Sequence, residues 1–255
     1  MTFEKILPVL DIHAHLGGYG RQAIPDEGSP ETLVKMMDRV GFTASFVSHM
    51  AGVMGQTYIG NKLAAEACAE YPGRLLAYLV FNPNAPEKSV TREVESFVNC
   101  PGVVGLKFHS TIHGAHANDK RYGPAYELAE KYKLPILMHT WGAADVTAVD
   151  AVCAARPNIT VIAGHSGGNV WSDITACCDA ALRRENLYLD LCLSLYREGQ
   201  LEYMVKKVSA DKIVFGSDAS FFCSLPGYAR VIFARIHDED KRKILYDNTK
   251  KIFEL

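Results

Sequence analysis

The stretch Val9-Leu10-Asp11-Ile12-His13-Ala14-His15-Leu16 decides how the rest of the chain is interpreted. It is an apolar run that ends in two histidines at positions i and i+2. On a β-strand alternate side chains point to the same face, so His13 and His15 are predicted to project together. Their Cα atoms would lie about 6.5–7 Å apart, close enough for both imidazoles to bind one metal ion. Taken alone, the pair is equally compatible with two polar residues at a strand end.

The overall composition is that of an ordinary globular protein. The 255 residues are 48% hydrophobic and 22% charged, with a formal net charge of −2. This balance predicts neither a nucleic-acid nor a membrane-surface partner, and no apolar run is long enough to cross a bilayer. The N-terminus lacks a basic segment followed by a long apolar one, so secretion is not expected. The seven cysteines include no CxxC pair, which favours reduced thiols in a cytoplasmic protein.

Short apolar runs recur along the chain, and a helical pattern follows each of them. The eight runs are 9–16, 43–49, 75–81, 103–109, 134–139, 159–165, 187–192 and 213–218. Near-continuous apolar runs fit strands that are buried on both faces of a parallel sheet. Their alternation with helices favours a single (β/α)8 TIM barrel domain over residues 1–255. The alternative is an open doubly wound sheet, although neither GxGxxG nor GxxxxGK[ST] is present to support nucleotide binding.

Polar side chains fall at the carboxyl ends of these runs. They are His13, His15, Lys107, His109, His139, His165 and Asp218. In a barrel the carboxyl ends of the strands converge on one face, where active sites are built. Because so many imidazole, amine and carboxylate groups reach that face independently, packing alone does not explain them, and the set predicts a metal site.

His139 and Asp218 extend the pair on the first strand. A lone histidine at a strand end is usually a structural residue, but together with His13 and His15 we expect His139 to be a metal ligand. Asp218, in Phe215-Gly216-Ser217-Asp218, either caps the next loop or lies close to a metal as ligand and proton acceptor. We favour the second interpretation.

Three further residues leave alternatives open. His165, in Gly164-His165-Ser166-Gly167-Gly168, is either a metal ligand or a base beside the metal. The glycines form a tight turn or clear room for a ligand. Lys107 either binds substrate or an acid as an ammonium group, or carries a carbamate that bridges two metals. His109 shares its strand face, one step nearer the mouth, where it would contact substrate.

Weaker indications come from a loop and from the seventh strand. Arg21 lies in a long Gly-rich loop over residues 17–29, where it either binds an anionic substrate group or is solvated. Asp190 and Cys192 share the face of the seventh strand that points into the barrel or its mouth. A nucleophilic Cys192 would need a neighbouring base, and the sequence assigns neither residue a role.

These residues, in this order, resemble the amidohydrolase superfamily, and specifically its amidohydrolase-related branch. The matching motifs are Asp11-Ile12-His13-Ala14-His15, Gly105-Leu106-Lys107-Phe108-His109, Leu134-Pro135-Ile136-Leu137-Met138-His139, Gly164-His165-Ser166-Gly167-Gly168 and Phe215-Gly216-Ser217-Asp218. The resemblance implies a metal-dependent barrel with His13, His15, His139 and Asp218 as ligands of one metal. His165 would be a ligand of a second metal or a catalytic base. Lys107 matches the position that carries a carbamate in binuclear members.

The predicted function is hydrolysis of a C–N or C–O bond in a small-molecule substrate, with Asp218 and His165 as catalytic residues. A divalent metal, first Zn²⁺ and second Mn²⁺, would activate water and polarise a carbonyl. The branch also includes hydratases and non-oxidative decarboxylases, so a metal-dependent decarboxylase of an unsaturated or aromatic acid is the alternative. A non-catalytic, metal-binding barrel is a third. Substrate identity and oligomeric state are left open, a homo-oligomer included.

Overall fold

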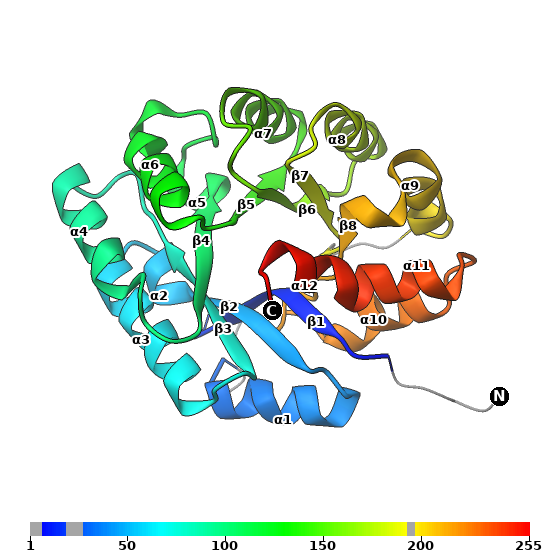
Figure 1. Cartoon of the computed structure of the whole chain (residues 1–255), viewed down its shortest axis with the longest axis horizontal. Coiled ribbons are helices and arrows are strands. Elements are labelled where there is room, and N and C mark those ends of the chain that lie inside the picture. The colour runs from blue at the N-terminus through cyan, green and yellow to red at the C-terminus, as the bar shows by residue number, and fades with distance from the viewer. Residues whose placement is uncertain (1–6, 19–27, 193–196) are drawn as a thin grey trace.

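The computed structural model describes residues 7–18, 28–192 and 197–255. Arg21, with its predicted anion-binding role, lies outside the described residues. Eight parallel strands form one sheet, in which spatial neighbours follow chain order from β1 to β8. Figure 1 shows this sheet curled around a centre, with helices around its outside. The fold is therefore α/β, with the predicted alternation of strands and helices.

The strands are short, and helices connect them along the outside of the sheet. The strands are β1 (Leu10–Leu16), β2 (Ala44–His49), β3 (Leu75–Val80), β4 (Val103–His109), β5 (Ile136–Trp141), β6 (Val161–Gly167), β7 (Leu187–Asp190) and β8 (Ile213–Val214). The longer helices are α1 (Pro30–Val40), α3 (Thr57–Glu70), α4 (Glu87–Phe97), α6 (Gly123–Tyr132), α7 (Ala143–Ala155), α8 (Trp171–Arg183), α9 (Gln200–Val208) and α10 (Ser224–Ile232). Shorter helical segments are α2 (Met50–Val53), α5 (Ser110–His113), η2 (Lys120–Tyr122), η3 (Ala210–Lys212), α11 (Asp238–Arg242), η4 (Lys243–Asp247) and α12 (Asn248–Ile252).

β8 is shorter than predicted, and the expectation that this strand reaches Asp218 is wrong. After Val214 the backbone leaves β7 and bonds to β1 instead. The Ile12 N–H donates to the Phe215 carbonyl over 2.9 Å, and the Asp218 N–H donates to the His13 carbonyl over 2.8 Å. Asp218 has a φ of 60°, outside the strand region of backbone space. It therefore lies on a turn that is held against β1.

β1 contains a bulge between Asp11 and Ala14, where two of its residues oppose one residue of β2. Ile12 packs into the apolar cluster inside the sheet. His13, the next residue, also lies inside, because its ring centroid is 5.3 Å from that of His15. The bulge thus lets consecutive side chains face the same interior.

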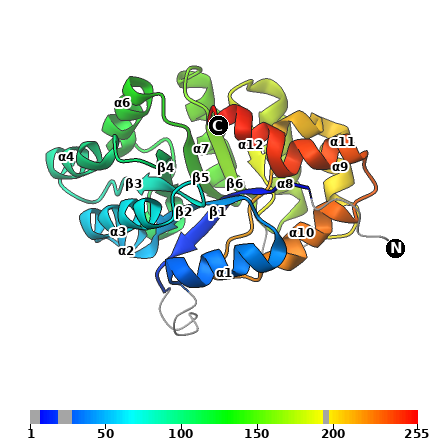
Figure 2. The ribbon, with the colours of Figure 1, turned by 60° about the horizontal axis from the view of Figure 1, so that its bottom comes forward.

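The interior has an apolar layer where the strands begin and a polar layer where they end. The apolar layer is Leu10, Ile12, Ala44, Phe46, Leu76, Tyr78, Leu137, Ile162 and Val214. Phe253, which follows α12, covers this layer, with its ring centroid 4.6 Å from that of Phe46. In Figure 2, α12 lies at the top and β1 points towards the bottom, so the C-terminal segment covers the end where the strands begin. The polar layer lies at the opposite end.

A larger apolar cluster fills the space between the sheet and the helices that surround it. In α1, Leu33 and Met37 are buried on the side that faces the sheet. Both ends of this helix follow ordinary capping rules, since Ser29 accepts a hydrogen bond from the Thr32 N–H and Gly41 ends the helix at a φ of 77°.

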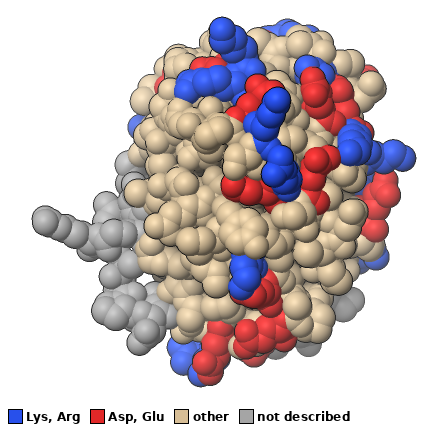
Figure 3. Space-filling model, turned by 90° about the vertical axis from the view of Figure 1, so that its left-hand side faces the viewer, with Lys and Arg blue, Asp and Glu red and all other residues tan. Residues whose placement is uncertain are grey.

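The surface is polar and of mixed charge. Figure 3 shows basic and acidic side chains interleaved, rather than gathered into a patch of one sign, on the side of the molecule where α3 and α4 lie. Across the surface such groups form pairs, for example Lys131 of α6 with Glu95 of α4 at 2.9 Å. No helix in the described part of the chain has the length and apolar character of a membrane span.

Candidate metal centre

The polar layer brings together ligand atoms from β1 and from the turn after β8. One ligand atom from each of His13, His15 and Asp218 lies within 4.8 Å of the other two. The Nε2 atom of His15 is 3.1 Å from Oδ1 of Asp218, and that of His13 is 3.8 Å from the same oxygen. All three residues are buried. Three of the four predicted ligands of a single metal therefore lie in one cluster.

β6 and the segment after β7 contribute a second, overlapping group. His13, His165 and Cys192 also have ligand atoms within 4.8 Å of one another. The ring centroids of His165 and His13 are 4.9 Å apart. His139 belongs to neither group, although its ring centroid lies 4.8 Å from that of His165. It therefore lies in the same layer, next to the clusters.

In all four of these histidines, Nδ1 is engaged by the protein. It contacts Asp190 Oδ2 at 2.7 Å in His13, Ser48 Oγ at 3.1 Å in His15, Ser110 Oγ at 3.3 Å in His139 and the Cys192 carbonyl oxygen at 2.7 Å in His165. The Cys192 carbonyl oxygen can only accept, so His165 donates from Nδ1, and His13 does the same when the Asp190 carboxylate is ionised. That tautomer leaves a lone pair on Nε2, the atom that would bind a metal, and in His13 this atom also contacts Nζ of Lys107.

In His109, by contrast, Nδ1 accepts a hydrogen bond instead of donating one. Its Nδ1 accepts a hydrogen bond from the Ile112 N–H at 3.4 Å, so the ring proton is placed on Nε2. Its ring stacks on that of His139, with centroids 4.0 Å apart. His109 is therefore a hydrogen-bond donor and not a metal ligand in this arrangement, which suits the predicted contact with substrate.

The electrostatics of the layer favour neutral imidazoles and one ionised carboxylate. Burial lowers the pKa values of His13, His15 and His139, and that of His165 to about 4. For Asp218 burial alone would raise the pKa, but the hydrogen bond from His15 and the nearby His165 and Lys107 lower it overall. Neutral imidazole and carboxylate are the forms that bind divalent metals.

Asp190, which the sequence left without a role, orients His13. Besides His13 it accepts from the backbone N–H groups of His165 at 3.2 Å and Cys192 at 2.9 Å. Two glycines make room for the pair. A Cβ on Gly216 would collide with Asp190 Oδ1 and lie 2.7 Å from His13 Cβ, and one on Gly164 would lie 3.2 Å from the His13 ring.

Asp11, in the first motif, instead holds the turn that carries Asp218. Its carboxylate accepts from the Ser217 hydroxyl at 2.6 Å and from the Ser217 N–H at 2.9 Å. Burial raises the pKa of Asp11 to about 7. The described structure therefore links Asp11 to the turn after β8 rather than to a histidine ring.

Lys107 is completely buried beneath the cluster. Its Nζ lies 2.8 Å from Nε2 of His13, and burial lowers its pKa to about 8. The amine thus faces the centre of the layer, where both a positive charge and a modified amine could act on bound groups.

A cavity of about 230 Å³ opens onto the polar layer. It is lined by His15, Met50, His109, Thr111, Ile112, His139, Trp141, His165, Asp218, Phe221 and Phe222. The ring of Phe221 stacks on His15 with centroids 4.9 Å apart, and the Trp141 ring lies 5.3 Å from that of His165. The cavity therefore has a polar floor and largely aromatic or apolar walls.

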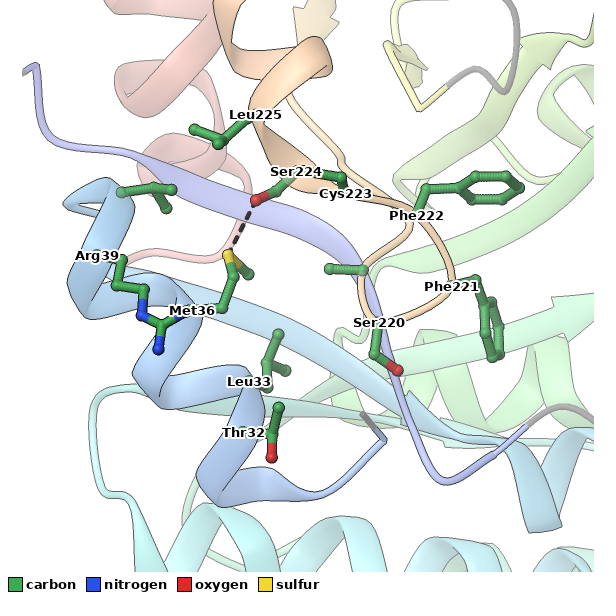
Figure 4. A pocket seen from close by; sticks show the side chains of 12 residues that line it. Thr32, Leu33, Met36, Arg39, Ser220, Phe221, Phe222, Cys223, Ser224 and Leu225 are labelled. Atoms are coloured by element: carbon green, nitrogen blue, oxygen red, sulfur yellow. Dashed lines mark hydrogen bonds between the residues drawn. The ribbon is translucent and has the colours of Figure 1, made fainter. Parts of the chain in front are cut away.

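A second pocket of about 420 Å³ lies between α1 and the segment 219–225. Figure 4 shows Arg39, Met36 and Leu33 of α1 on one side, with Ser224 bonded to Met36 at 2.9 Å. Phe221 and Phe222 line both this pocket and the cavity above the polar layer. The segment 219–225 is therefore the wall between the two spaces.

Comparisons with known proteins identify a family and a fold. The sequence model of the amidohydrolase family matches residues 10–255, whereas no curated protein sequence matches the chain. Among solved structures, an uncharacterized TIM-barrel protein from Bordetella bronchiseptica has a TM-score of 0.77 at 18% identity, and the match covers 97% of this chain and 99% of the other.

Two enzymes have similar folds. The 5-carboxyvanillate decarboxylase of Novosphingobium aromaticivorans, solved with manganese and 4-hydroxy-3-methoxy-5-nitrobenzoic acid, has a TM-score of 0.77 at 13% identity, covering 99% of this chain and 97% of its own. The 4-oxalomesaconate hydratase of Rhodopseudomonas palustris has a TM-score of 0.72 at 16% identity, covering 96% and 95%. At such low identities these likenesses show the fold alone.

Proposed function

The chain belongs to the amidohydrolase family, and from that premise we propose that its polar layer binds one divalent metal ion. His13, His15 and Asp218 would hold the ion, and His139 would complete the set. The donors suit this role because burial favours neutral imidazoles, the Nε2 atoms of His13 and His15 face the Asp218 carboxylate, and that carboxylate is ionised. Zn²⁺ is the first candidate, and Mn²⁺, which is present in one neighbour, is the second.

The reaction proposed first is hydrolysis of a C–N or C–O bond in a small substrate. A bound divalent ion supplies Lewis-acid polarisation of a carbonyl and a lower pKa for water. Asp218, which lines the cavity, accepts the proton of the attacking water and passes it to the leaving group. His165 orients the reacting groups, and the His109 Nε2–H donates to the substrate.

One observation carries this proposal: the buried carboxylate of Asp218 lines the cavity, and its Oδ1 lies 3.1 Å from Nε2 of His15. That position is where a general base for a metal-activated water is needed. Lys107 then acts as an amine that binds an anionic group of the substrate, and its modification to a carbamate belongs to the alternative with two metals and His165 as a ligand.

A decarboxylase is the second candidate, and the cavity walls favour it. Trp141, Phe221 and Phe222 present flat rings above the polar floor, and such walls suit a planar unsaturated or aromatic acid. One structural neighbour decarboxylates an aromatic acid, by its name. In this reaction the same ligands would hold the ion, and no water would enter the product.

A substrate panel separates the two reactions. Protein loaded with Zn²⁺ or Mn²⁺ is incubated with small lactones, amides and unsaturated acids, and CO₂ release is measured beside the appearance of new carboxyl or amine groups. Hydrolysis is supported when oxygen from ¹⁸O-labelled water enters the product. Release of CO₂ without that label supports the decarboxylase, and metal binding without turnover on any substrate contradicts both.

We also propose that the strands around the site close into a barrel. Residues 1–255 would form one closed (β/α)8 barrel domain, since β1 bonds both to β2 and to the segment after β8. The partner is a small molecule, and Arg21, outside the described residues, stays a prediction for binding an anionic substrate group.

A further inference from the structure

A chain of four side chains links His139 to the surface. Ser110 Oγ lies 3.3 Å from His139 Nδ1 and 2.5 Å from Asp145 Oδ2. The other oxygen of Asp145 lies 2.6 Å from Nδ1 of His116. Asp145 is 4% exposed, whereas the side chain of His116 is 57% exposed. The chain therefore runs from solvent, through a buried carboxylate, to the polar layer.

The protons in this chain are ordered by what each group can accept. Asp145 accepts from the Ser110 hydroxyl and from the Trp141 N–H at 3.0 Å. The Ser110 hydroxyl has one proton and two acceptors, Asp145 Oδ2 at 2.5 Å and the His139 carbonyl oxygen at 3.1 Å, so its oxygen is left to accept from Nδ1 of His139. His139 then carries its proton on Nδ1, and the lone pair of Nε2 is directed away from Ser110.

From these contacts we infer that Asp145, acting through Ser110, is a positioning residue for His139, and that His116 supports Asp145 from the surface. Asp145 is to His139 what Asp190 is to His13, with a hydroxyl between carboxylate and imidazole. The inference rests on the proposed function, in which His139 is a metal ligand. It assigns a role in metal binding to a residue of α7 and a residue of the loop before η2.

The role also explains why a carboxylate is buried at this position. Asp145 lies in the first turn of α7, where a negative charge is favourable. A favourable charge at the start of a helix requires neither burial of the carboxylate nor a hydrogen bond from the Ser110 hydroxyl of α5. Asp173 occupies the first turn of α8, where its carboxylate accepts from the hydroxyl of the neighbouring Ser172 at 3.4 Å. Asp173 is therefore a matched control that lacks the link to the layer.

The first test is metal affinity. Zn²⁺ and Mn²⁺ affinities are measured by competition with a chelator for the whole protein and for Asp145→Asn, Ser110→Ala, His116→Ala and Asp173→Asn. We expect a loss of about 10- to 100-fold for the first two variants, a smaller loss for His116→Ala, because water can replace an exposed partner, and no change for Asp173→Asn. Circular dichroism establishes that each variant is folded.

The second test reads the tautomer of His139 without any metal. Long-range ¹H–¹⁵N spectra of the metal-free protein should show His139 protonated at Nδ1, and a mixture of tautomers in Ser110→Ala and Asp145→Asn. A folded Asp145→Asn with unchanged affinity and unchanged tautomer overturns the inference. If the unaltered protein binds no divalent metal, the proposed function fails instead, and the tautomer still decides whether Asp145 positions His139.

Discussion

Nδ1 of His13 lies 2.7 Å from Oδ2 of Asp190, although 177 positions separate the two residues in the chain. The same carboxylate accepts from the backbone of His165 and of Cys192. One buried side chain therefore fixes His13 of β1 against β6 and the end of β7. This relationship makes the layer a single unit rather than a set of independent strand ends.

Replacing Asp190 should weaken metal binding. In Asp190→Asn the amide is a poorer acceptor for the His13 Nδ1–H, and affinity for Zn²⁺ or Mn²⁺ is expected to fall about 10- to 100-fold. Calorimetric titration measures the change. Asp150→Asn is the control, because Asp150 pairs with Arg183 and Arg184 on the surface. Equal affinities for both variants would mean that Asp190 does not orient a ligand.

A single methyl group at Gly216 should disrupt the same pair. The added Cβ of Gly216→Ala would collide with Asp190 and approach His13, so both must move or the backbone must shift. Overpacking of this kind costs about 1–3 kcal/mol, and the displaced imidazole should also bind metal more weakly. Urea unfolding and metal titration measure the two effects. Gly123→Ala, where nothing lies within 4 Å of the new atom, serves for comparison and should change neither.

Removing the proton acceptor should abolish turnover while leaving the fold intact. Asp218→Asn cannot accept the proton of the attacking water, and the rate is expected to fall about 10²- to 10⁴-fold. The measurement is turnover on the best substrate of the panel, with metal content determined in the same sample. Asp211→Asn, on the surface beside Lys243, is the matched control. Wild-type turnover in a metal-loaded Asp218→Asn would exclude this carboxylate as the base.

Metal removal should destabilise the protein. Binding to the folded state alone adds about 2.7 kcal/mol when free metal is about 100 times Kd, so a chelator should lower the melting temperature and added Zn²⁺ or Mn²⁺ should restore it. Elemental analysis is expected to give one ion per chain, and intact mass should show no CO₂ adduct on Lys107. Two ions with such an adduct would support the binuclear alternative.

The stability of the metal-free protein should fall as the pH drops below about 6.5, the ordinary pKa of histidine. Burial lowers the pKa values of the five imidazoles of the site, His13, His15, His109, His139 and His165. The unfolded chain therefore binds protons at these groups at a higher pH than the folded protein. These five imidazoles therefore add to the free energy of unfolding above the ordinary histidine pKa, and this contribution is lost on acidification.

Two buried carboxylates act in the opposite direction. Burial raises the pKa values of Asp11 and Asp190 to about 7 and about 8, so the folded protein keeps protons there that the unfolded chain releases above about 4. Because five imidazoles outnumber two carboxylates, the net stability should decrease on acidification. Urea unfolding between neutral pH and pH 5 measures the slope, and an increase in stability over this range would show that the carboxylates dominate.

Much of the fold could be predicted, because strands buried on both faces leave a clear apolar signal. All eight runs are strands, and Ser29 and Gly41 bound α1 as the capping rules predict. The end of β8 was predicted wrongly because Phe215 continues the apolar run, while the backbone there pairs with β1. That exchange of partners depends on tertiary contacts, which the local sequence does not contain.

The candidate site was predicted unevenly for a similar reason. Side chains that share a strand end, such as His13 and His15, follow from spacing alone. The groups that orient them do not, since Ser48, Ser110 and Asp145 are common polar residues at positions without a motif. Asp190 had a usable signal, because it is a charged residue inside an apolar run, but only the structure shows its contact with His13.

The bulge in β1 determines which segment must be transferred when this centre is built into another protein scaffold. On a regular strand the residue before the first histidine of a His-x-His pair would face outwards. Here Ile12 faces inwards and fills the layer directly beneath His13. A transplanted pair without the extra residue would leave a cavity beneath its first histidine, so the unit to transfer is the bulged segment from Asp11 to His15 rather than the two histidines.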